Sequence, residues 1–294
     1  MNEPLVSTSA VSKRYGDVTA LDRVDLVVRK GSVYGLVGPN GAGKTTMLAI
    51  LAGLRKPSDG TTRIDTASVA VLPDTPQFDG WLTGREVVAL SLTLQGDTSS
   101  RSAVDDVLGI AGLTEDADRK VRGYSRGMLQ RLGLAAAVVT TPDLLLLDEP
   151  AAALDPAGRR EVLNLVSAMK GRSTVLFSSH ILDDVAEVCD DIGILRRGEM
   201  VYQGSLDGLL RRYVGRGFGV RLRSGADDVK DALLSEPWVT SVGVGPDETL
   251  AVVVSDVAEA ERRLVQVLAA SGHPVVSVTQ SKSSLEQVFL EVTK

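Results

Sequence analysis

The 294-residue sequence has a single cysteine, Cys189, and only two histidines. One cysteine cannot form an internal disulfide, and these few ligands cannot build the usual Cys/His zinc cluster. No apolar run approaches the roughly 20 residues that cross a bilayer, and the longest, LGLAAAVV at 132–139, has eight residues. The N-terminal sequence lacks the basic and apolar segments of a secretory signal. We therefore exclude a transmembrane, secreted, disulfide-linked or zinc-finger protein and expect a cytoplasmic one.

Basic residues are outnumbered as well: 32 Lys and Arg stand against 38 Asp and Glu, which gives a net charge of −6. Broad nucleic-acid binding normally needs a basic face, so we expect no nucleic-acid partner. What is present, 44% hydrophobic and 24% charged residues, is ordinary for a globular protein. At about 100–200 residues per domain, the length predicts two domains.

Strand and helix patterns alternate up to about residue 204, which predicts an α/β fold with a largely parallel sheet. Apolar runs predict buried strands, and Arg197-Gly198 predicts the turn of a hairpin. The expected strands are 33–37, 144–147 and 174–179, the hairpin is 191–204, and the expected helices are 47–53, 155–169 and 205–213.

The Gly-rich segment 214–219 predicts a linker between a first domain, 1–213, and a small appendage, 214–294. The order of elements in the appendage is that of a split β-α-β unit, so we predict an α+β ferredoxin-like domain. Its expected strands are 218–223, 239–244, 249–254 and 274–279, and its expected helices are 226–235, 257–270 and 283–291.

The segment GPNGAGKTT fits the pattern G-x-x-x-x-G-K-[ST] between a predicted strand and a predicted helix. Its glycines let successive backbone N–H groups point inward as an anion nest, and the following helix adds its dipole. Lys44 would reach the β- and γ-phosphates, and Thr45 would bind Mg²⁺. A chance glycine-rich turn is the alternative, expected in about one random chain in a hundred. The candidate phosphate-binding residues are Gly38, Pro39, Asn40, Gly41, Ala42, Gly43, Lys44, Thr45 and Thr46.

Two carboxylates follow the predicted strand in LLLLDEP. Asp148 is suited to hold Mg²⁺, and Glu149 is suited to polarise an attacking water. His180 ends another apolar strand, where it can contact the γ-phosphate and hold Glu149 in line. Taken singly, these residues read as solvated acids and a structural histidine; beside a phosphate loop, catalytic roles for Lys44, Glu149 and His180 are favoured.

With these motifs in this order, residues 5–213 resemble the ATP-binding subunit of an ABC transporter. The resemblance implies a P-loop NTPase fold of ABC type with a helical subdomain at about 78–140. It also implies ATP and Mg²⁺ as ligands. The matching segments are Tyr15 in SKRYGDVTALD, GPNGAGKTT, VLPDTPQF, YSRGMLQRL, LLLLDEP, ALD at 153–155, and His180.

Two segments depart from the family pattern. The family has the signature LSGGQ, and this chain has YSRGM in its place. The serine and the second glycine are kept as Ser125 and Gly127, but Arg126 replaces the first glycine. Ser125 and Gly127 are expected to contact the γ-phosphate bound by a second subunit, the alternative being a plain capped helix start. The segment VLPDTPQF matches the Q-loop of the family, but Asp74 stands where the family has glutamine. Gln77 aligns less well with that position because VLP at 71–73 sets the register. Asp74 can bind Mg²⁺ through oxygen but adds negative charge beside the phosphates.

Tyr15 is expected to stack on adenine, although a surface aromatic beside a hairpin is the alternative. The resemblance further implies a head-to-tail homodimer that encloses two ATP molecules, with Asp155 crossing the interface. Separate membrane permease subunits would contact residues near 78–95. This places the chain on the inner face of the cell membrane.

The ending SSLEQVFLEVTK resembles that of drug-export ATPases of the daunorubicin-resistance type, which favours export. A generic amphipathic helix is the alternative for this segment. Two other functions stay open: a non-transport ABC ATPase acting on ribosomes or nucleic acid, and an importer ATPase.

Overall fold

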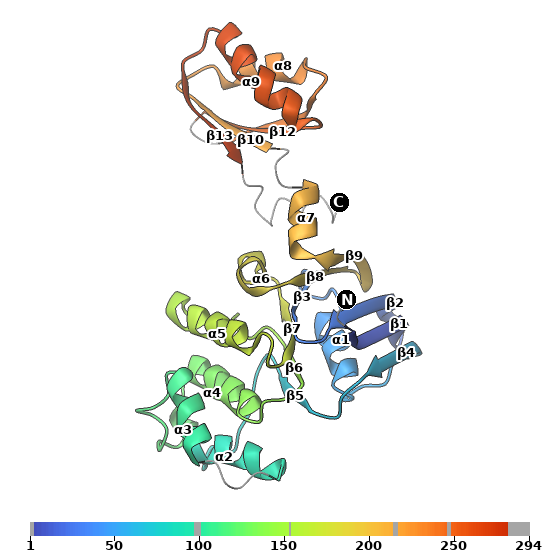
Figure 1. Cartoon of the computed structure of the whole chain (residues 1–294), viewed down its shortest axis with the longest axis vertical. Coiled ribbons are helices and arrows are strands. Elements are labelled where there is room, and N and C mark those ends of the chain that lie inside the picture. The colour runs from blue at the N-terminus through green and yellow to red at the C-terminus, as the bar shows by residue number, and fades with distance from the viewer. Residues whose placement is uncertain (1–2, 97–100, 153, 214–216, 246–247, 282–294) are drawn as a thin grey trace. The chain divides into compact units, whose positions relative to one another are not determined.

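Figure 1 shows the computed structural model of the chain, which describes residues 3–96, 101–152, 154–213, 217–245 and 248–281. The chain forms two compact units, Met1–Leu206 and Asp207–Lys294. This division falls after the first residue of the helix α7 (Leu206–Tyr213), whereas the sequence analysis expects the domain boundary after the helix. Within the described ranges, no helix combines the length and apolar character needed to span a membrane.

The first unit is built on a six-stranded sheet with the strand order β5-β6-β7-β3-β8-β9. All neighbouring strands are parallel except β8 and β9, which are antiparallel. Three strands are buried along their whole length, which explains their unbroken apolar sequences, because a parallel sheet is covered on both faces. The predicted α/β fold is confirmed. The strands are β3 (Val33–Val37), β5 (Val69–Leu72), β6 (Leu144–Leu147), β7 (Thr174–Ser179), β8 (Asp191–Arg196) and β9 (Glu199–Ser205).

Helices cover both faces of this sheet (Figure 1). Successive strand residues point to opposite faces, so Leu36 shares a core with Met47 of α1 (Lys44–Leu51), whereas Gly35 faces Val185 of α6 (Leu182–Val188). A Cβ at Gly35 would lie 2.7 Å from the Val185 side chain, so glycine lets α6 approach the sheet closely. The helix α5 (Pro156–Met169) packs beside α6.

The start of α1 corrects the prediction of a helix over 47–53. The helix begins at Lys44, directly after Gly43, and ends at Leu51. The glycine loop therefore passes straight into the helix, and the residues after Gly43 form the first helical turn. The hairpin prediction is confirmed: Arg197 and Gly198 have φ values of 50° and 84°, the left-handed backbone that a two-residue turn requires.

A separate antiparallel sheet with the order β2-β1-β4 lies beside α1. Its strands are β1 (Pro4–Tyr15), β2 (Val18–Arg29) and β4 (Asp59–Ile64). Leu21 and Val24 of β2 are buried with Met47 and Leu51 of α1 in one apolar cluster. This packing fixes the end of β1, and with it Tyr15, next to the loop that precedes α1.

The segment between β5 and β6 is helical and has its own apolar cluster, which includes Val88, Leu108 and Leu132. Thr83 and Glu86 form a capping box at the start of its first helix. The elements are α2 (Gly84–Leu94), α3 (Arg101–Ile110), the 3₁₀ helix η1 (Val121–Gly123) and α4 (Arg126–Val138).

The second unit has a four-stranded antiparallel sheet with the order β11-β12-β10-β13. From β10 on, its element order, β-α-β-β-α-β, is that of a split β-α-β unit. Side chains of α8 and α9 share one apolar core with the sheet. The elements are β10 (Gly217–Leu222), α8 (Ala226–Leu234), β11 (Val239–Val244), β12 (Thr249–Val254), α9 (Val257–Ala270) and β13 (Val275–Ser281). The helix expected at 283–291 lies outside the described residues.

Candidate functional site

The loop between β3 and α1 is shaped by glycines. Gly41 and Gly43 have φ values of 80° and 108°, which side-chain-bearing residues rarely adopt. A Cβ at Gly43 would lie 2.5 Å from the carbonyl oxygen of Ala20, so the loop also needs glycine for space. Because α1 begins at the next residue, its unpaired N–H groups and positive dipole end face the loop. The loop is therefore suited to hold an anion.

A cleft of about 620 Å³ opens at this loop. It gathers most of the residues predicted from the sequence, although they come from five separate stretches of the chain. The predicted residues that line it are Tyr15, Asn40, Gly41, Ala42, Gly43, Lys44, Thr45, Thr46, Asp74, Asp148, Glu149 and His180. Tyr15 is 43% exposed, and the Lys13 ammonium lies 5.2 Å from the centre of its ring. The Tyr15 ring, with Lys13 over one face, thus lies in the same cleft as the phosphate loop.

Lys44 is buried and has three oxygen partners. Its Nζ donates to the carbonyl oxygens of Gly38 (2.7 Å) and Pro39 (3.3 Å), and it pairs with Glu149 Oε1 at 3.2 Å. These contacts compensate the loss of water around a buried ammonium. They also show the role of Gly38 and Pro39, whose carbonyl groups aim the lysine.

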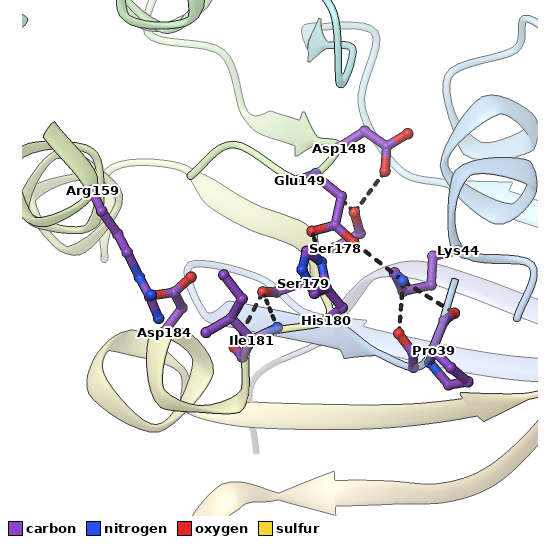
Figure 2. A network of polar contacts seen from close by, with 11 residues as sticks. Pro39, Lys44, Asp148, Glu149, Arg159, Ser178, Ser179, His180, Ile181 and Asp184 are labelled. Atoms are coloured by element: carbon purple, nitrogen blue, oxygen red, sulfur yellow. Dashed lines mark hydrogen bonds and ion pairs between the residues drawn. The ribbon is translucent and has the colours of Figure 1, made fainter. Parts of the chain in front are cut away.

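Glu149 is held from two sides (Figure 2). Its Oε1 pairs with Lys44, and its Oε2 lies 2.8 Å from His180 Nδ1. A carboxylate only accepts hydrogen bonds, so Nδ1 is the donor and the other ring nitrogen is left for another partner. The backbone of Glu149 is left-handed, with φ 48°, which is costly for a residue with a side chain. The carboxylate is therefore fixed in one place by a cation, an imidazole and an unusual backbone turn.

Asp148, the neighbouring acid, is almost fully buried and bonded to a residue that the sequence analysis missed. The Ser178 hydroxyl donates to Asp148 Oδ1 at 2.6 Å and accepts the Glu149 N–H at 2.9 Å. The only signal in the sequence is the pair of serines that ends the otherwise apolar strand TVLFSS. The contact itself depends on β6 lying beside β7, which the local sequence does not show.

The turn after β7 orients His180. Ile181 N–H donates to Ser179 Oγ at 2.9 Å, and the Ser179 hydroxyl donates to the Ile181 carbonyl at 3.1 Å. In the next helix, Asp184 is paired with Arg159 of α5 (Figure 2). Burial raises the pKa of the Asp184 carboxyl, and the Arg159 guanidinium opposes that rise. This ion pair ties the helix that follows His180 to α5.

The two Q-loop candidates separate in the structure. Asp74 lines the cleft of the phosphate loop, whereas Gln77 lines a second hollow. Asp74 follows β5, and the Asp148 N–H donates to the Leu72 carbonyl of that strand at 2.8 Å. Asp74 and Asp148 therefore leave the sheet from neighbouring strands on the same edge.

The second hollow has a volume of about 320 Å³ and lies between β5, α2 and α4. Its lining is mainly apolar and includes Val71, Phe78 and Leu94. The Leu94 side chain is 79% exposed.

Five predicted residues do not line the cleft: Gly38 and Pro39, whose carbonyl groups contact Lys44, and Ser125, Gly127 and Asp155. Ser125 caps α4 and accepts the Met128 N–H at 3.2 Å, and Asp155 caps α5 and accepts the Gly158 N–H at 3.0 Å. A Cβ at Gly127 would lie 3.1 Å from the Leu154 side chain. Within one chain, Ser125 and Asp155 thus act as helix caps.

Comparisons with known proteins agree with this geometry. A sequence profile described as ABC transporter matches residues 21–152. The chain is 34% identical to the uncharacterized ABC transporter ATP-binding protein YxlF of Bacillus subtilis, over 98% of this chain and 99% of that one. It is also 34% identical to the daunorubicin resistance ATP-binding protein DrrA3 of Streptomyces coeruleorubidus, over 100% and 97%. A solved dimeric ATP-binding cassette in a post-hydrolysis state, bound to ADP and phosphate, is 26% identical and has a TM-score of 0.63, over 68% of this chain and 98% of that one.

Proposed function

The chain belongs to the ABC transporter ATP-binding proteins, and we propose that it uses Mg²⁺-dependent ATP hydrolysis to power an exporter formed by separate membrane subunits. One observation carries the hydrolytic part of the proposal. Glu149 is held between Lys44 and His180 in the cleft of the phosphate loop. A carboxylate in that position is suited to act as a general base toward a water that attacks a bound phosphate.

Binding of ATP would use both ends of the cleft. Tyr15 offers its ring to the base, and the loop N–H groups together with the Lys44 ammonium hold the β- and γ-phosphates. Lys44 then exchanges its contacts with the Gly38 and Pro39 carbonyls for phosphate oxygens. Release of the Lys44–Glu149 ion pair at this moment frees the carboxylate for the attacking water.

In the hydrolytic step, Glu149 accepts a hydrogen bond from the water and takes up its proton as the water oxygen bonds to the γ-phosphorus. The bond between that phosphorus and the bridging oxygen breaks, which leaves ADP and phosphate. His180 donates to Glu149 through Nδ1 and holds the carboxylate in line. Its second ring nitrogen is available to a γ-phosphate oxygen.

The residues beside the phosphate loop fit Mg²⁺, which prefers oxygen ligands and keeps several waters. Thr45, Asp74 and Asp148 all bring oxygen atoms to the same cleft. Ser178 bonds only Oδ1 of Asp148, so Oδ2 is left for the ion. When bound, Mg²⁺ neutralises phosphate charge that develops during transfer. Asp74 would tune the affinity for the ion, since it adds a carboxylate where the family has an amide.

A head-to-tail homodimer is supported by the positions of Ser125, Gly127 and Asp155. These residues match family motifs but lie outside the cleft of their own chain. In a dimer, Ser125 and Gly127 at the start of α4 would close the partner's cleft over the γ-phosphate, and Asp155 would contact the partner. The post-hydrolysis cassette with the same fold is dimeric.

Export is supported by the full-length similarity to a daunorubicin resistance protein. The second hollow, between β5, α2 and α4, offers an apolar site on which a permease segment can dock, and it overlaps the predicted contact at 78–95. Gln77 and Leu94 both line this hollow, and Asp74 of the nucleotide cleft is three residues before Gln77. This short connection would relay the state of the cleft to the membrane subunit at the inner face of the membrane.

The test of hydrolysis is Glu149→Gln, compared with Glu115→Gln at an exposed position. The amide keeps the size of the side chain but cannot accept the proton, so the ATPase rate should fall by about 10²-fold or more while ATP still binds. Glu115→Gln should hydrolyse ATP as the wild type does. A Glu149→Gln rate close to that of the wild type would contradict the assigned base.

The test of export is co-purification of the tagged chain with its membrane subunits, followed by ATP-dependent efflux from vesicles that contain the complex. Association with ribosomes in place of a permease, or inward transport by the complex, would contradict an exporter.

A further inference from the structure

Ser178 occupies a central place in the site, and neither the sequence motifs nor the proposed mechanism uses it. It lies in β7, which is flanked by β6 and β3. Leu147 pairs with Phe177 and Leu36 pairs with Ser178, so Ser178 stands at the edge of the sheet from which both the acidic pair and the phosphate loop emerge. Its side chain is fully buried.

The Ser178 hydroxyl bonds to both acidic residues, Asp148 and Glu149 (Figure 2). It donates its single hydrogen to Asp148 Oδ1 at 2.6 Å and accepts the Glu149 N–H at 2.9 Å. A hydrogen bond from a hydroxyl to a carboxylate is among the strong hydrogen bonds of proteins, and 2.6 Å is the length expected of one. Because the hydroxyl is buried, water does not compete for these two hydrogen bonds.

The bridge has two consequences for the reaction. With Oδ1 engaged, the Asp148 carboxylate cannot rotate freely, and Figure 2 shows its second oxygen pointing away from Ser178. The second consequence concerns Glu149, whose backbone has φ 48° and would relax without a restraint. The bond from its N–H to Ser178 is such a restraint, and it determines where the Glu149 carboxylate is placed.

We propose that Ser178 is a positioning residue for ATP hydrolysis: its hydroxyl orients Asp148 toward the metal ion and holds the backbone that aims Glu149 at the attacking water. The inference rests on the proposed function, because it assigns Ser178 a role in that reaction. Groups that orient a metal ligand through a hydrogen bond typically contribute 10- to 100-fold to metal affinity or activity.

The same strand offers two matched controls at its other end. Ser173, just before β7, is buried, and its hydroxyl has no hydrogen-bond partner among the described residues. Thr174 is buried, and its hydroxyl accepts the Gly31 N–H at 2.9 Å. It pairs with Leu144, at the end of β6 opposite the acidic pair. Ser173→Ala therefore tests the substitution alone, and Thr174→Val tests the loss of a buried hydrogen bond that only supports the fold.

The experiment compares Ser178→Ala with these two controls and with Ser178→Thr, which keeps the hydroxyl. Thermal unfolding reports folding, and steady-state kinetics separates kcat from KM. Calorimetric titration with ATP, once with Mg²⁺ and once with EDTA, gives a readout of metal binding that does not depend on turnover. Should the alanine variant not fold, Ser178→Cys takes its place, because a thiol fills a similar space and is only a weak donor.

We expect Ser178→Ala to lose 10- to 100-fold in kcat and a similar factor in the strengthening of ATP binding by Mg²⁺. ATP affinity in EDTA should stay within threefold of the wild type, and Ser178→Thr should recover most of both losses. Thr174→Val should lower the melting temperature and leave kcat and the Mg²⁺ effect unchanged. Ser173→Ala should leave both kcat and the Mg²⁺ effect unchanged.

The inference is overturned if folded Ser178→Ala retains the wild-type kcat and Mg²⁺ effect, or if it only loses stability as Thr174→Val does. Failure of the proposed function looks different, since the wild-type protein itself would then not hydrolyse ATP. In that case the two calorimetric titrations still decide whether Ser178 orients Asp148.

Discussion

The two units differ in what they bury. Every buried polar or charged residue in the part of the chain that the structure describes lies in the first unit. Lys44, Asp148 and Ser178 are among them, and they meet at one edge of the six-stranded sheet. The core of the second unit, in contrast, is a cluster of apolar side chains from its sheet and the helices α8 and α9.

This difference indicates that the reactive groups belong to the first unit, whereas the second unit has a packed apolar core. Burying a polar group costs free energy unless each donor and acceptor finds a partner. In the first unit, Lys44 and Asp148 are buried polar groups that also line the cleft of the phosphate loop. The second unit contains nothing of this kind in its described core, and packing is sufficient to explain its sequence. We therefore propose that the second unit assembles or regulates the complex, or only stabilises it, and takes no part in hydrolysis.

The largest effect is expected for Gly43→Ala in the first unit. The new Cβ would meet the Ala20 carbonyl at 2.5 Å and force a side-chain-bearing residue to adopt φ 108°. The loop must shift, and ATP affinity measured by calorimetry should fall by about 100-fold or more, since the N–H groups no longer converge.

Gly53→Ala is the control for this change, because Gly53 also has a positive φ, 71°, but no atom within 4 Å of a new Cβ. It should cost stability of about 1 kcal/mol and leave ATP affinity unchanged. ATP binding by Gly43→Ala with wild-type affinity would disprove the role given to the loop.

An intermediate effect is expected for Leu264→Ala in the second unit. Leu264 is buried in the core of this unit, and its truncation should lower the free energy of unfolding of the second unit by about 2–5 kcal/mol. The two tryptophans allow separate observation, because Trp81 belongs to the first unit and Trp238 to the second. Denaturant unfolding of Trp81→Phe proteins, followed by Trp238 fluorescence, measures the second unit alone.

ATP affinity should be unchanged in Leu264→Ala, and Val265→Ala, at a neighbouring exposed position, should alter stability by less than about 0.5 kcal/mol. Weaker ATP binding by Leu264→Ala, under conditions where the first unit is folded, would break the separation between the two units.

The smallest effect concerns the pH dependence of stability through Asp184, whose pKa is raised in the folded state by burial. The folded chain then holds this proton more tightly than the unfolded chain does. The free energy of unfolding should therefore fall as pH rises from about 3.8, the ordinary value, through the raised pKa, and level off above it.

Denaturant titrations at a series of pH values should show this fall in the wild type relative to Asp184→Asn, which has no proton to lose in this range. A difference between the two proteins that is independent of pH would show that Asp184 does not titrate as its burial indicates. ATP affinity at neutral pH should be similar in both, because Asp184 does not line the cleft.

Parts of the fold and site were predictable because they depend on neighbouring residues. The segments 33–37, 144–147 and 174–179 each contain an apolar run, and the structure has β3, β6 and β7 at these residues. The hairpin at Arg197-Gly198 followed from turn chemistry in the same way. The start of α1 was not predicted, since Lys44, Thr45 and Thr46 carry no apolar pattern and are helical because Gly43 directs the chain into the first turn.

The sequence by itself determined the phosphate loop, because the backbone freedom of Gly41 and Gly43 and the position of Lys44 are properties of one continuous segment. It also determined that Asp148 and Glu149 follow a buried strand. Only the tertiary structure decided that Ser178 bridges these two acids, that His180 and Lys44 hold Glu149 together, and that Asp74 lines the cleft whereas Gln77 does not. These contacts join residues from different strands, and they form because the order of strands in the sheet brings the carboxyl ends of β3, β5, β6 and β7 to one edge.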